Sequence, residues 1–533
     1  MAKDKRLDKY ISIYSILISI AIATGYFFDR INPISQWSKL DLTLWLSYTI
    51  VLFFIIKFLI KTITEKIHNY NTHNTQIVEC INDKKYYIIA FTVILICYAI
   101  VWLAYYPGLW NYDPHQVYQV IKNEYSSWHP LIHTLLLGGC YILGCNINNP
   151  DFGVVLYDWI QMLIMAGIFA YICILVLTIL KRKWIYVVTI LFYAIFPFHS
   201  ILAISSTKDV IFSGLVLLVM VLLLHYIKNQ SSKRLIVALT VLIPLMLLFR
   251  NNASYAYVLF IAIAIIALIK KIISKRTISL ILLLFVVYII INKLLVWGLN
   301  ATPTNLCEAA SIPCMQMGRI YYESVADEEE MEIIDKYIAL DCTTYSPHLA
   351  DEMKFYLRNV GTTSDFVEML FSSAKLFVKH PLVSIESILY LHEGAWYLGD
   401  VSHAEIYGKG MEEKQGYLIT NLYSGYGITP NSKIPGLEHV LERLYSNNEY
   451  QKNPILTVIF SPAFYNWILI GCLFVFLYQK KYQELFVSTF LVCFAITVLL
   501  GPATLIRYYY PIIVSTPLII AWVIRSPDVQ RKQ

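Results

Sequence analysis

A short stretch between two apolar segments gathers residue types that could carry acid–base chemistry. Residues 106–130 contain Asp113, Trp128 and His129, where a plain turn would need none of them. A carboxylate can accept a proton from an attacking hydroxyl, and an imidazole can orient that carboxylate or the substrate. We therefore take Asp113 as a candidate catalytic base and His129 as its helper. Two alternatives remain open, since an Asp-Pro pair also initiates turns and His129 also precedes a helix.

Three basic side chains stand at span ends that the charge pattern places on the same side of the membrane as this stretch. They are Lys208, Arg250 and Arg507. Basic residues are disfavoured on the outer side, so their presence there calls for a reason. Ammonium and guanidinium groups bind phosphate well, whereas snorkelling towards lipid headgroups is the alternative for each residue alone. The candidate substrate-binding residues are Lys208, Asp209, Arg250, Arg507, Tyr508, Gln116 and Trp128, and no metal ligand is assigned.

The composition shows what kind of protein must position these residues. Hydrophobic residues make up 58% of the 533-residue chain and charged residues only 15%. A soluble domain carries about 25% charged residues, so the sequence indicates an all-α polytopic membrane protein. No small-residue cleavage site follows the first apolar segment, so no cleavable signal peptide is expected. Nothing in the charge pattern indicates nucleic-acid binding.

Apolar runs of about 20 residues recur along the chain, as helical spans require. Together with the basic loops they predict about twelve transmembrane helices in a cell membrane, with both termini in the cytoplasm. The predicted spans are residues 10–28, 42–63, 86–105, 152–180, 184–201, 210–227, 235–249, 254–269, 278–297, 455–478, 485–500 and 509–524.

One further apolar segment, residues 129–145, is not counted as a span. If it crossed the membrane, four basic clusters that follow it in the chain would all fall on the outer side. These clusters lie at residues 181–183, 228–234, 270–276 and 480–481. A re-entrant or interface-lying helix keeps all four in the cytoplasm, and we predict that arrangement.

Residues 298–452 form a polar insert of about 155 residues that differs in charge from the membrane body. The insert holds 22 acidic and 11 basic residues, although the whole chain has a net charge of +6. This asymmetry predicts that the insert lies outside the cell while the basic loops lie inside. Helices are expected at 328–338, 363–379 and 437–444, and a loop at 408–436. Cys307 and Cys314 could form a disulfide or remain two thiols.

The predicted organisation therefore has four parts. Residues 1–85 hold two spans and a cytoplasmic loop. Residues 86–297 form a membrane core with the first outer loop at 106–151. The acidic insert at 298–452 follows, and residues 453–533 supply three spans and a cytoplasmic tail.

The order of the polar motifs resembles that of a known group. The motifs are Tyr106-Pro107-Gly108…Asp113…Gln116, Trp128-His129-Pro130, Thr207-Lys208-Asp209 and Arg507-Tyr508…Pro511. They resemble a group of bacterial multi-pass membrane proteins of uncharacterised function, over most of residues 86–524. That group is related to the GT-C superfamily of glycosyltransferases, which use polyprenyl-phosphate-linked sugars.

The resemblance implies a GT-C-like fold and an inverting transfer of sugar to a cell-envelope glycan, lipid or protein. It implies that Asp113 is the base and that Lys208, with Arg250 or Arg507, grips the lipid-linked phosphate. Many superfamily members carry two adjacent acidic residues in the first outer loop, whereas Pro114 follows Asp113 here. A requirement for a divalent metal is therefore left open.

A transporter or flippase for a lipid-linked or anionic solute is the alternative function. A protein with twelve spans fits that class well. Against it, the polar clusters gather at one face and the two halves of the chain show no repeat. The sequence does not identify the sugar or the acceptor.

Overall fold

A computed structural model describes residues 2–30, 34–73, 83–111, 113–339, 345–399, 423, 425–445 and 449–525. Regular structure within these ranges is helical, with three isolated β-bridges and no strand. The predicted all-α, polytopic class is therefore confirmed for the described part of the chain.

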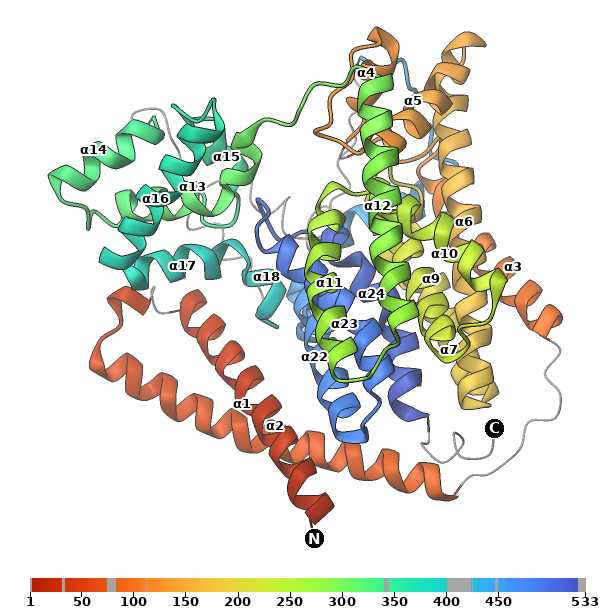
Figure 1. Ribbon diagram of the computed structural model, residues 1–533, viewed down its shortest axis with the longest axis horizontal. Helices are drawn as coiled ribbons and strands as arrows, with labels where there is room; N and C mark the ends of the chain where they lie inside the picture. Colours follow the sequence, from red (N-terminus) through yellow and green to blue (C-terminus); the bar gives the residue numbers. More distant parts are fainter. Residues whose placement is uncertain are drawn as a thin grey trace.

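Figure 1 shows the helices of the membrane body, with the insert between α12 and α21. They are α1 Ala2–Arg30, α2 Lys39–His73, α3 Asp83–Ala104, α4 Gln116–Lys122, α5 Leu131–Asn146, α6 Pro150–Leu180, α7 Lys183–Ile195, α8 Pro197–Ala203, α9 Asp209–Lys228, α10 Lys233–Leu248, α11 Asn251–Ile269, α12 Lys275–Gly298, α21 Pro454–Phe460, α22 Pro462–Gln479, α23 Tyr482–Val498 and α24 Ile506–Ile524.

Among the described residues, nine helices are long and apolar enough to cross a membrane. The predicted span at 184–201 is instead two helices, α7 and α8, which meet at an angle of 49° and would make a tenth span together. Pro197 causes this break, because proline cannot continue the hydrogen bonding of α7. Two other predicted spans, α10 and α23, have only 16 and 17 residues. The count of twelve therefore stays a prediction.

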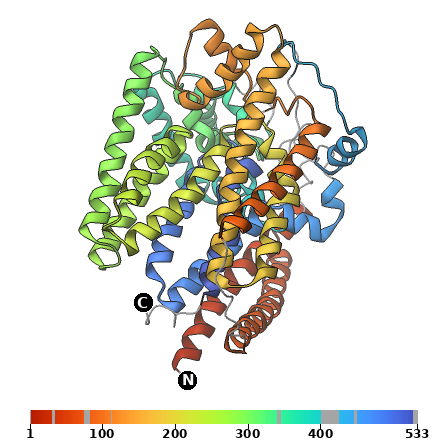
Figure 2. The ribbon, with the colours of Figure 1, turned by 90° about the vertical axis from the view of Figure 1, so that its right-hand side faces the viewer.

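Helix α5, which corresponds to the segment at 129–145, has 16 residues. A span needs about 20 residues, so this length agrees with a helix that does not cross. Figures 1 and 2 show α4 and α5 together at the end of the bundle opposite the N-terminus.

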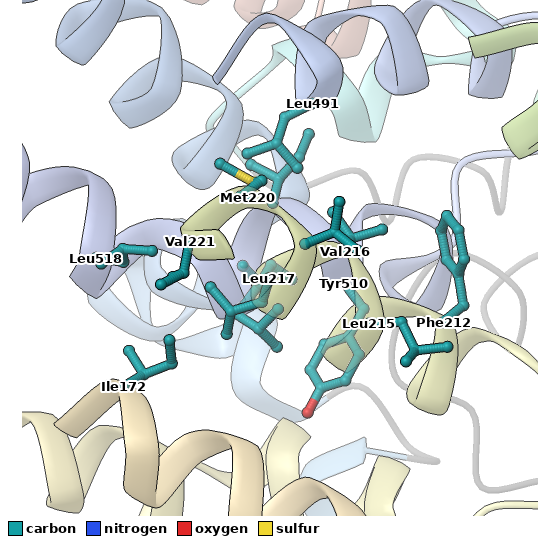
Figure 3. Close-up of a cluster of buried hydrophobic side chains, with 14 of the residues drawn as sticks. Ile172, Phe212, Leu215, Val216, Leu217, Met220, Val221, Leu491, Tyr510 and Leu518 are labelled. Carbon is teal, nitrogen blue, oxygen red and sulfur yellow. The ribbon is translucent and has the colours of Figure 1, made fainter. Parts of the chain in front are cut away.

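Helix α9 lies at the centre of the membrane body and is enclosed on almost every side. Its Leu217 and Val221 are fully buried, and they lie among side chains of α6, α23 and α24 (Figure 3). Because lipid tails are as apolar as these residues, close packing rather than removal from water holds such helices together. The first residue of α9 follows directly after Lys208, so this packing fixes the backbone that carries that side chain.

Polar side chains also tie the helices together inside the bundle. The hydroxyl of Tyr98 on α3 donates to the carbonyl of Tyr193 on α7 at 2.9 Å. The hydroxyl of Tyr193 in turn donates to the carbonyl of Val514 on α24 at 2.7 Å. Each bond satisfies a polar group away from water and fixes α24 relative to α3 and α7.

The loops at the two ends of the bundle differ in composition. At one end, Lys228, the last residue of α9, pairs with Glu484 on α23 at 2.7 Å, and the Lys481 ammonium donates to backbone carbonyls at the end of α24. The opposite end carries α4, α5 and the first residues of α9 and α24. The basic loops and the candidate site therefore lie at opposite ends, while the assignment of either end to the cytoplasm stays a prediction.

The insert has a hydrophobic core of its own, separate from that of the membrane body. The helices around this core are α13 Ser311–Tyr322, α14 Glu328–Tyr337, α15 Ala350–Lys354, α16 Thr363–Lys379 and α17 Pro381–Leu391. Two further helices of the insert, α18 Glu393–Trp396 and α20 Pro435–Tyr445, pack instead on the membrane body, against α22 and α3.

Helices α14, α16 and α20 lie where three insert helices were predicted. Of the predicted loop at 408–436, residues 408–422 and 424 lie outside the described residues. Residues 425–434 form no helix or strand, as predicted, whereas Pro435 and Gly436 already belong to α20. Cys307 and Cys314 are free thiols.

Candidate active site

Backbone contacts join the loop that carries Asp113 to the loop that carries Lys208. The amide of Leu109 donates to the carbonyl of Ile204 at 2.9 Å, and the amide of Ser206 donates to the carbonyl of Leu109 at 3.1 Å. The hydroxyl of Ser206 donates to the carbonyl of Asn111 at 2.6 Å and accepts from the amide of Asn111 at 2.9 Å. Two segments almost a hundred residues apart are thereby fixed side by side.

Asp113 is shared between two cations. Its Oδ2 lies 3.0 Å from Nζ of Lys208 and 3.3 Å from Nη1 of Arg507. The Asp113 side chain is 8% exposed. Burial by itself would raise the pKa of this carboxyl, but the charges of Lys208 and Arg507 outweigh it and hold the pKa well below its usual range. Asp113 is therefore ionised at neutral pH.

A second carboxylate, Asp209, joins the same group of charges at the start of α9. Nη1 of Arg250 pairs with its Oδ1, and Nη1 of Arg507 lies 3.7 Å from its Oδ2. The hydroxyl of Thr207 links the two, since it accepts from Arg507 at 3.3 Å and donates to Asp209 at 3.1 Å. We call Asp113, Lys208, Asp209, Arg250 and Arg507 the charged cluster.

The charged cluster contains three cations and two carboxylates. Burial lowers the pKa of Arg250 to about 10 and also lowers that of Lys208, against the opposing effect of Asp113. Arg250 thus stays protonated at neutral pH, and the ion pair with Asp113 favours the ammonium form of Lys208. The cluster carries one positive charge in excess, in a largely buried place. Such a place attracts an anion.

Tyr508 lies between the two arginines of the cluster. The guanidinium carbons of Arg250 and Arg507 are 4.9 Å and 5.0 Å from the centre of its ring. Cations are attracted to an aromatic face, and more strongly where water is excluded. The ring therefore holds both guanidinium groups in place.

His129 is neutral and its tautomer follows from its partners. Burial lowers its pKa to about 2, with Lys208 adding to the effect. Its Nδ1 lies 3.2 Å from the Lys208 ammonium, which can only donate, so Nδ1 must accept. The proton is then on Nε2, which donates to Nε2 of His115 at 2.9 Å. His129 is thus a hydrogen-bonding neighbour of the charged cluster and adds no charge to it. The ring of Trp128 packs beside it at a tilt of 39°, with ring centres 4.6 Å apart, and Trp128 is 47% exposed.

Gln116 lies outside the charged cluster, in a separate buried network. Its Oε1 accepts from the hydroxyl of Thr134 at 2.9 Å and lies 3.2 Å from Nδ1 of His133. Nε2 of His133 lies 2.9 Å from the hydroxyl of Tyr157, which donates onwards to Gln161 at 3.1 Å. The predicted substrate contact of Gln116 remains a prediction. In the structure, Gln116 joins the start of α4 to α5.

A cleft with a volume of about 260 Å³ lies next to His129, between α5, α10, α11 and α12. Its walls combine polar side chains, among them Asn251 and Asn292, with leucines such as Leu247 and Leu295. The Asn251 amide donates to the carbonyls of Ser127 and Trp128, which fixes the loop before His129. The cleft extends the site from the charged cluster towards the lipid-facing helices α11 and α12.

The structure brings together eight of the nine predicted site residues: Asp113, Trp128, His129, Lys208, Asp209, Arg250, Arg507 and Tyr508. Among the described residues no group of three or more metal-binding side chains is present.

The sequence reasoning named Thr207 only as part of a motif, without a role in the site, and it missed Asp158. Thr207 adjoins the Lys-Asp pair, so its position was a usable signal. Asp158 on α6 is fully buried, has no hydrogen-bond partner among the described residues, and lies against Gly108. Its place within an apolar span was the signal that could have identified it.

The comparisons with known proteins place the chain in a family without assigning an activity. Residues 11–533 match DUF6020, a family of unknown function, and the chain belongs to this family. No curated protein and no solved structure matches the chain significantly.

Proposed function

We propose that this protein is an integral-membrane glycosyltransferase of the GT-C kind. It transfers a sugar from a polyprenyl-phosphate donor to a hydroxyl on a cell-envelope acceptor at the outer face of a bacterial membrane. One observation carries the proposal: a buried, ionised carboxylate is held by two cations at the end of the spans, in a cluster with one cation in excess. The termini are cytoplasmic in this proposal, and the insert lies outside.

The donor phosphate binds at the cations of the charged cluster. Lys208 and Arg507 already face a carboxylate oxygen, so their donors are aimed at an anionic partner. When the bond between sugar and phosphate breaks, negative charge grows on the phosphate that departs. Donors fixed in advance in a water-poor site stabilise such developing charge strongly.

Asp113 acts as the base that accepts the acceptor's proton. In the empty site its ion pairs lower its pKa and therefore its basicity. A bound phosphate would draw Lys208 and Arg507 away from the carboxylate, which raises the pKa of Asp113 when the donor is in place. Attack by the hydroxyl on the anomeric carbon forms the new glycosidic bond as the phosphate leaves, and the proton passes to Asp113. The configuration at that carbon is then inverted.

The cleft beside His129 receives the part of the donor next to the phosphate. Its amide and hydroxyl groups suit a sugar, and its leucines suit the first units of a lipid chain. The insert, joined to the site through the segment before Arg507, helps to select the acceptor.

Purified protein reconstituted in liposomes tests the proposal. It would receive a panel of radiolabelled polyprenyl-phosphate sugars with cell-envelope acceptors, and both transfer and movement of donor between leaflets would be measured. Wild-type protein should transfer label from one donor, Asp113→Asn should not, and Glu124→Gln should match wild type, because Glu124 is an exposed carboxylate of the same outer region.

A different result would point to the alternative function. The donor would then move between leaflets without any transfer, at the same rate in wild type and Asp113→Asn. That result would overturn the proposed glycosyltransferase function and identify a flippase.

A further inference from the structure

An exposed apolar surface runs along two helices of the insert, where a water-facing domain would carry polar groups. On α16 it consists of apolar side chains at helical spacing, and on α17 it continues with two more. Its members are Val367, Leu370, Phe371, Phe377, Val378, Leu382 and Ile385. We call this surface the apolar strip. Two of its side chains, Phe371 and Val378, are 73% and 80% exposed.

The strip is distinct from the face by which α16 packs on the insert. Met369 and Leu376 point into the core of the insert and are fully buried. A third side of α16 is polar and carries Ser364, Glu368 and Lys375. Lys375 pairs with Glu329 of α14 at 3.0 Å. The helix therefore has one face for the insert, one for water, and a separate apolar face that covers no other part of the described chain. A contiguous exposed apolar face of this kind marks an interaction surface.

The position of α17 identifies what covers the strip. Glu386 follows Ile385 directly, and its carboxylate accepts from the amide of Ser35 at 2.5 Å and from its hydroxyl at 3.0 Å. Ser35 lies in the turn between α1 and α2, both of which are long and apolar enough to span a membrane. The strip therefore continues directly from the place where two spans leave the bilayer. Figure 1 shows α17 next to the ends of α1 and α2.

Aromatic side chains gather at this same place, beside α17 and the ends of α1 and α2. Phe28 at the end of α1 stacks on Tyr390 of α17 with ring centres 4.5 Å apart, and lies 6.0 Å from Trp396 of α18. Trp37 and Trp45, 6.1 Å apart, stand at the start of α2. Tryptophan and tyrosine gather at the boundary between the headgroups and the hydrocarbon, so this group locates that boundary beside α17.

We propose that the apolar strip of α16 and α17 lies in the headgroup region of the bilayer, so that the insert rests on the membrane surface. Amphipathic helices bury their apolar face in this way, with the polar face directed to water. The lipid surface is the single occupant that we assign, and the proposal depends only on the membrane character of α1 and α2. Its consequence is that the membrane surface fixes the height of the insert above the spans.

Photolabelling of the full-length protein in liposomes tests this assignment. The liposomes would contain phosphatidylcholine, phosphatidylglycerol and a phospholipid with a diazirine group near its glycerol. After illumination and proteolysis, mass spectrometry should find lipid adducts in residues 367–385 as well as in α2. The double variant Phe371→Asp/Val378→Asp should lower the yield in 367–385 by roughly tenfold, while adducts in α2 stay unchanged.

Ser364→Asp/Ser372→Asp is the matched control, because it adds the same two negative charges on the polar side of the same helix. It should leave the yield in 367–385 unchanged. Adducts in α2 with none in 367–385 of the wild-type protein would overturn the proposal. So would equal yields in wild type and the double Asp variant.

Discussion

Two buried groups of ionised side chains differ in their balance of charge, and the difference separates a structural site from a binding site. In the insert, Arg319 lies 2.9 Å from Glu323 and 3.7 Å from Glu386, with its guanidinium carbon 4.8 Å from the ring centre of Tyr390. We call this group the insert ion cluster. Its cation is matched by two carboxylates, and the second carboxylate also binds Ser35.

The charged cluster at the end of the spans has the opposite balance. Three cations face two carboxylates there, and a cleft lies beside the neighbouring His129. A group whose cation is fully matched holds two segments together, whereas a group with an excess cation can accept an anion from outside. The same substitution in both groups should therefore have different consequences.

Arg319→Met is expected to have the largest effect, and the effect is on stability. It leaves Glu386 buried without its cation, which costs about 3–5 kcal/mol. Thermal unfolding in detergent should show a large loss of stability, while affinity for polyprenyl phosphate, measured below the transition, stays at the wild-type value. If Arg319→Met is as stable as the wild type but binds the phosphate poorly, the insert ion cluster is the binding site and the charged cluster is the structural one.

Arg507→Met should act mainly on binding. Lys208 and Arg250 remain to pair with Asp113 and Asp209, so the loss of stability should be smaller than for Arg319→Met. Removal of a charge-assisted donor to the phosphate should lower affinity by roughly a hundredfold, or about 2.7 kcal/mol. Equilibrium binding of radiolabelled polyprenyl phosphate measures this change. An unchanged affinity would show that the cluster serves only to hold α24.

Tyr508→Leu should have a smaller effect on the same affinity. It removes the ring between Arg250 and Arg507 and should weaken binding roughly fivefold, or about 1 kcal/mol. Tyr508→Phe keeps the ring and loses only a 3.4 Å contact from Arg507, so it should bind as the wild type does. If both variants weaken binding equally, the hydroxyl and not the ring is the part that matters.

Affinity for the donor should not change between about pH 6.5 and pH 8. His129, with its pKa lowered to about 2, and Asp113, with its pKa well below the usual range, do not titrate in that window. Binding measured across these pH values tests this expectation. An inflection would mean that His129 takes up a proton in the site.

Stability, unlike affinity, should change with pH. The pKa of His129 is lower in the folded than in the unfolded state, so its contribution is full above about pH 6.5 and shrinks as pH falls below that value. The lowered pKa of Asp113 gives a contribution that is present above about pH 4 and lost on further acidification. Melting curves at decreasing pH should therefore shift to lower temperature.

The sequence was most informative where a local signal decides the structure. Helix α16 has the predicted bounds because Thr362 and Asp365 form a capping box at its start. Lys208, Arg250 and Arg507 were found because basic residues at outer span ends are uncommon. Which carboxylate each of these cations pairs with could not be predicted from the sequence. Arg250 pairs with Asp209 rather than with Asp113, since the packing of α9 against α10 and α24 decides which carboxylate each cation reaches.

At the break between α7 and α8, by contrast, the prediction from sequence overlooked a local signal. Residues 184–201 are mostly apolar, and their hydropathy concealed a bend that Pro197 imposes locally. The apolar strip was also hidden, because an apolar residue in a helix predicts burial without saying which of two faces is buried. Only the three-dimensional structure separates Met369, inside the insert, from Phe371, outside it.

The most direct test of the central claim compares the affinity of the wild-type protein for polyprenyl phosphate and for the uncharged polyprenol of the same length. If the excess cation of the charged cluster binds a lipid-linked phosphate, the phosphate should bind roughly a hundredfold more tightly, and Lys208→Ala should remove most of that difference. Equal affinity for the two lipids in the wild type would contradict the assignment of this cluster as a phosphate site.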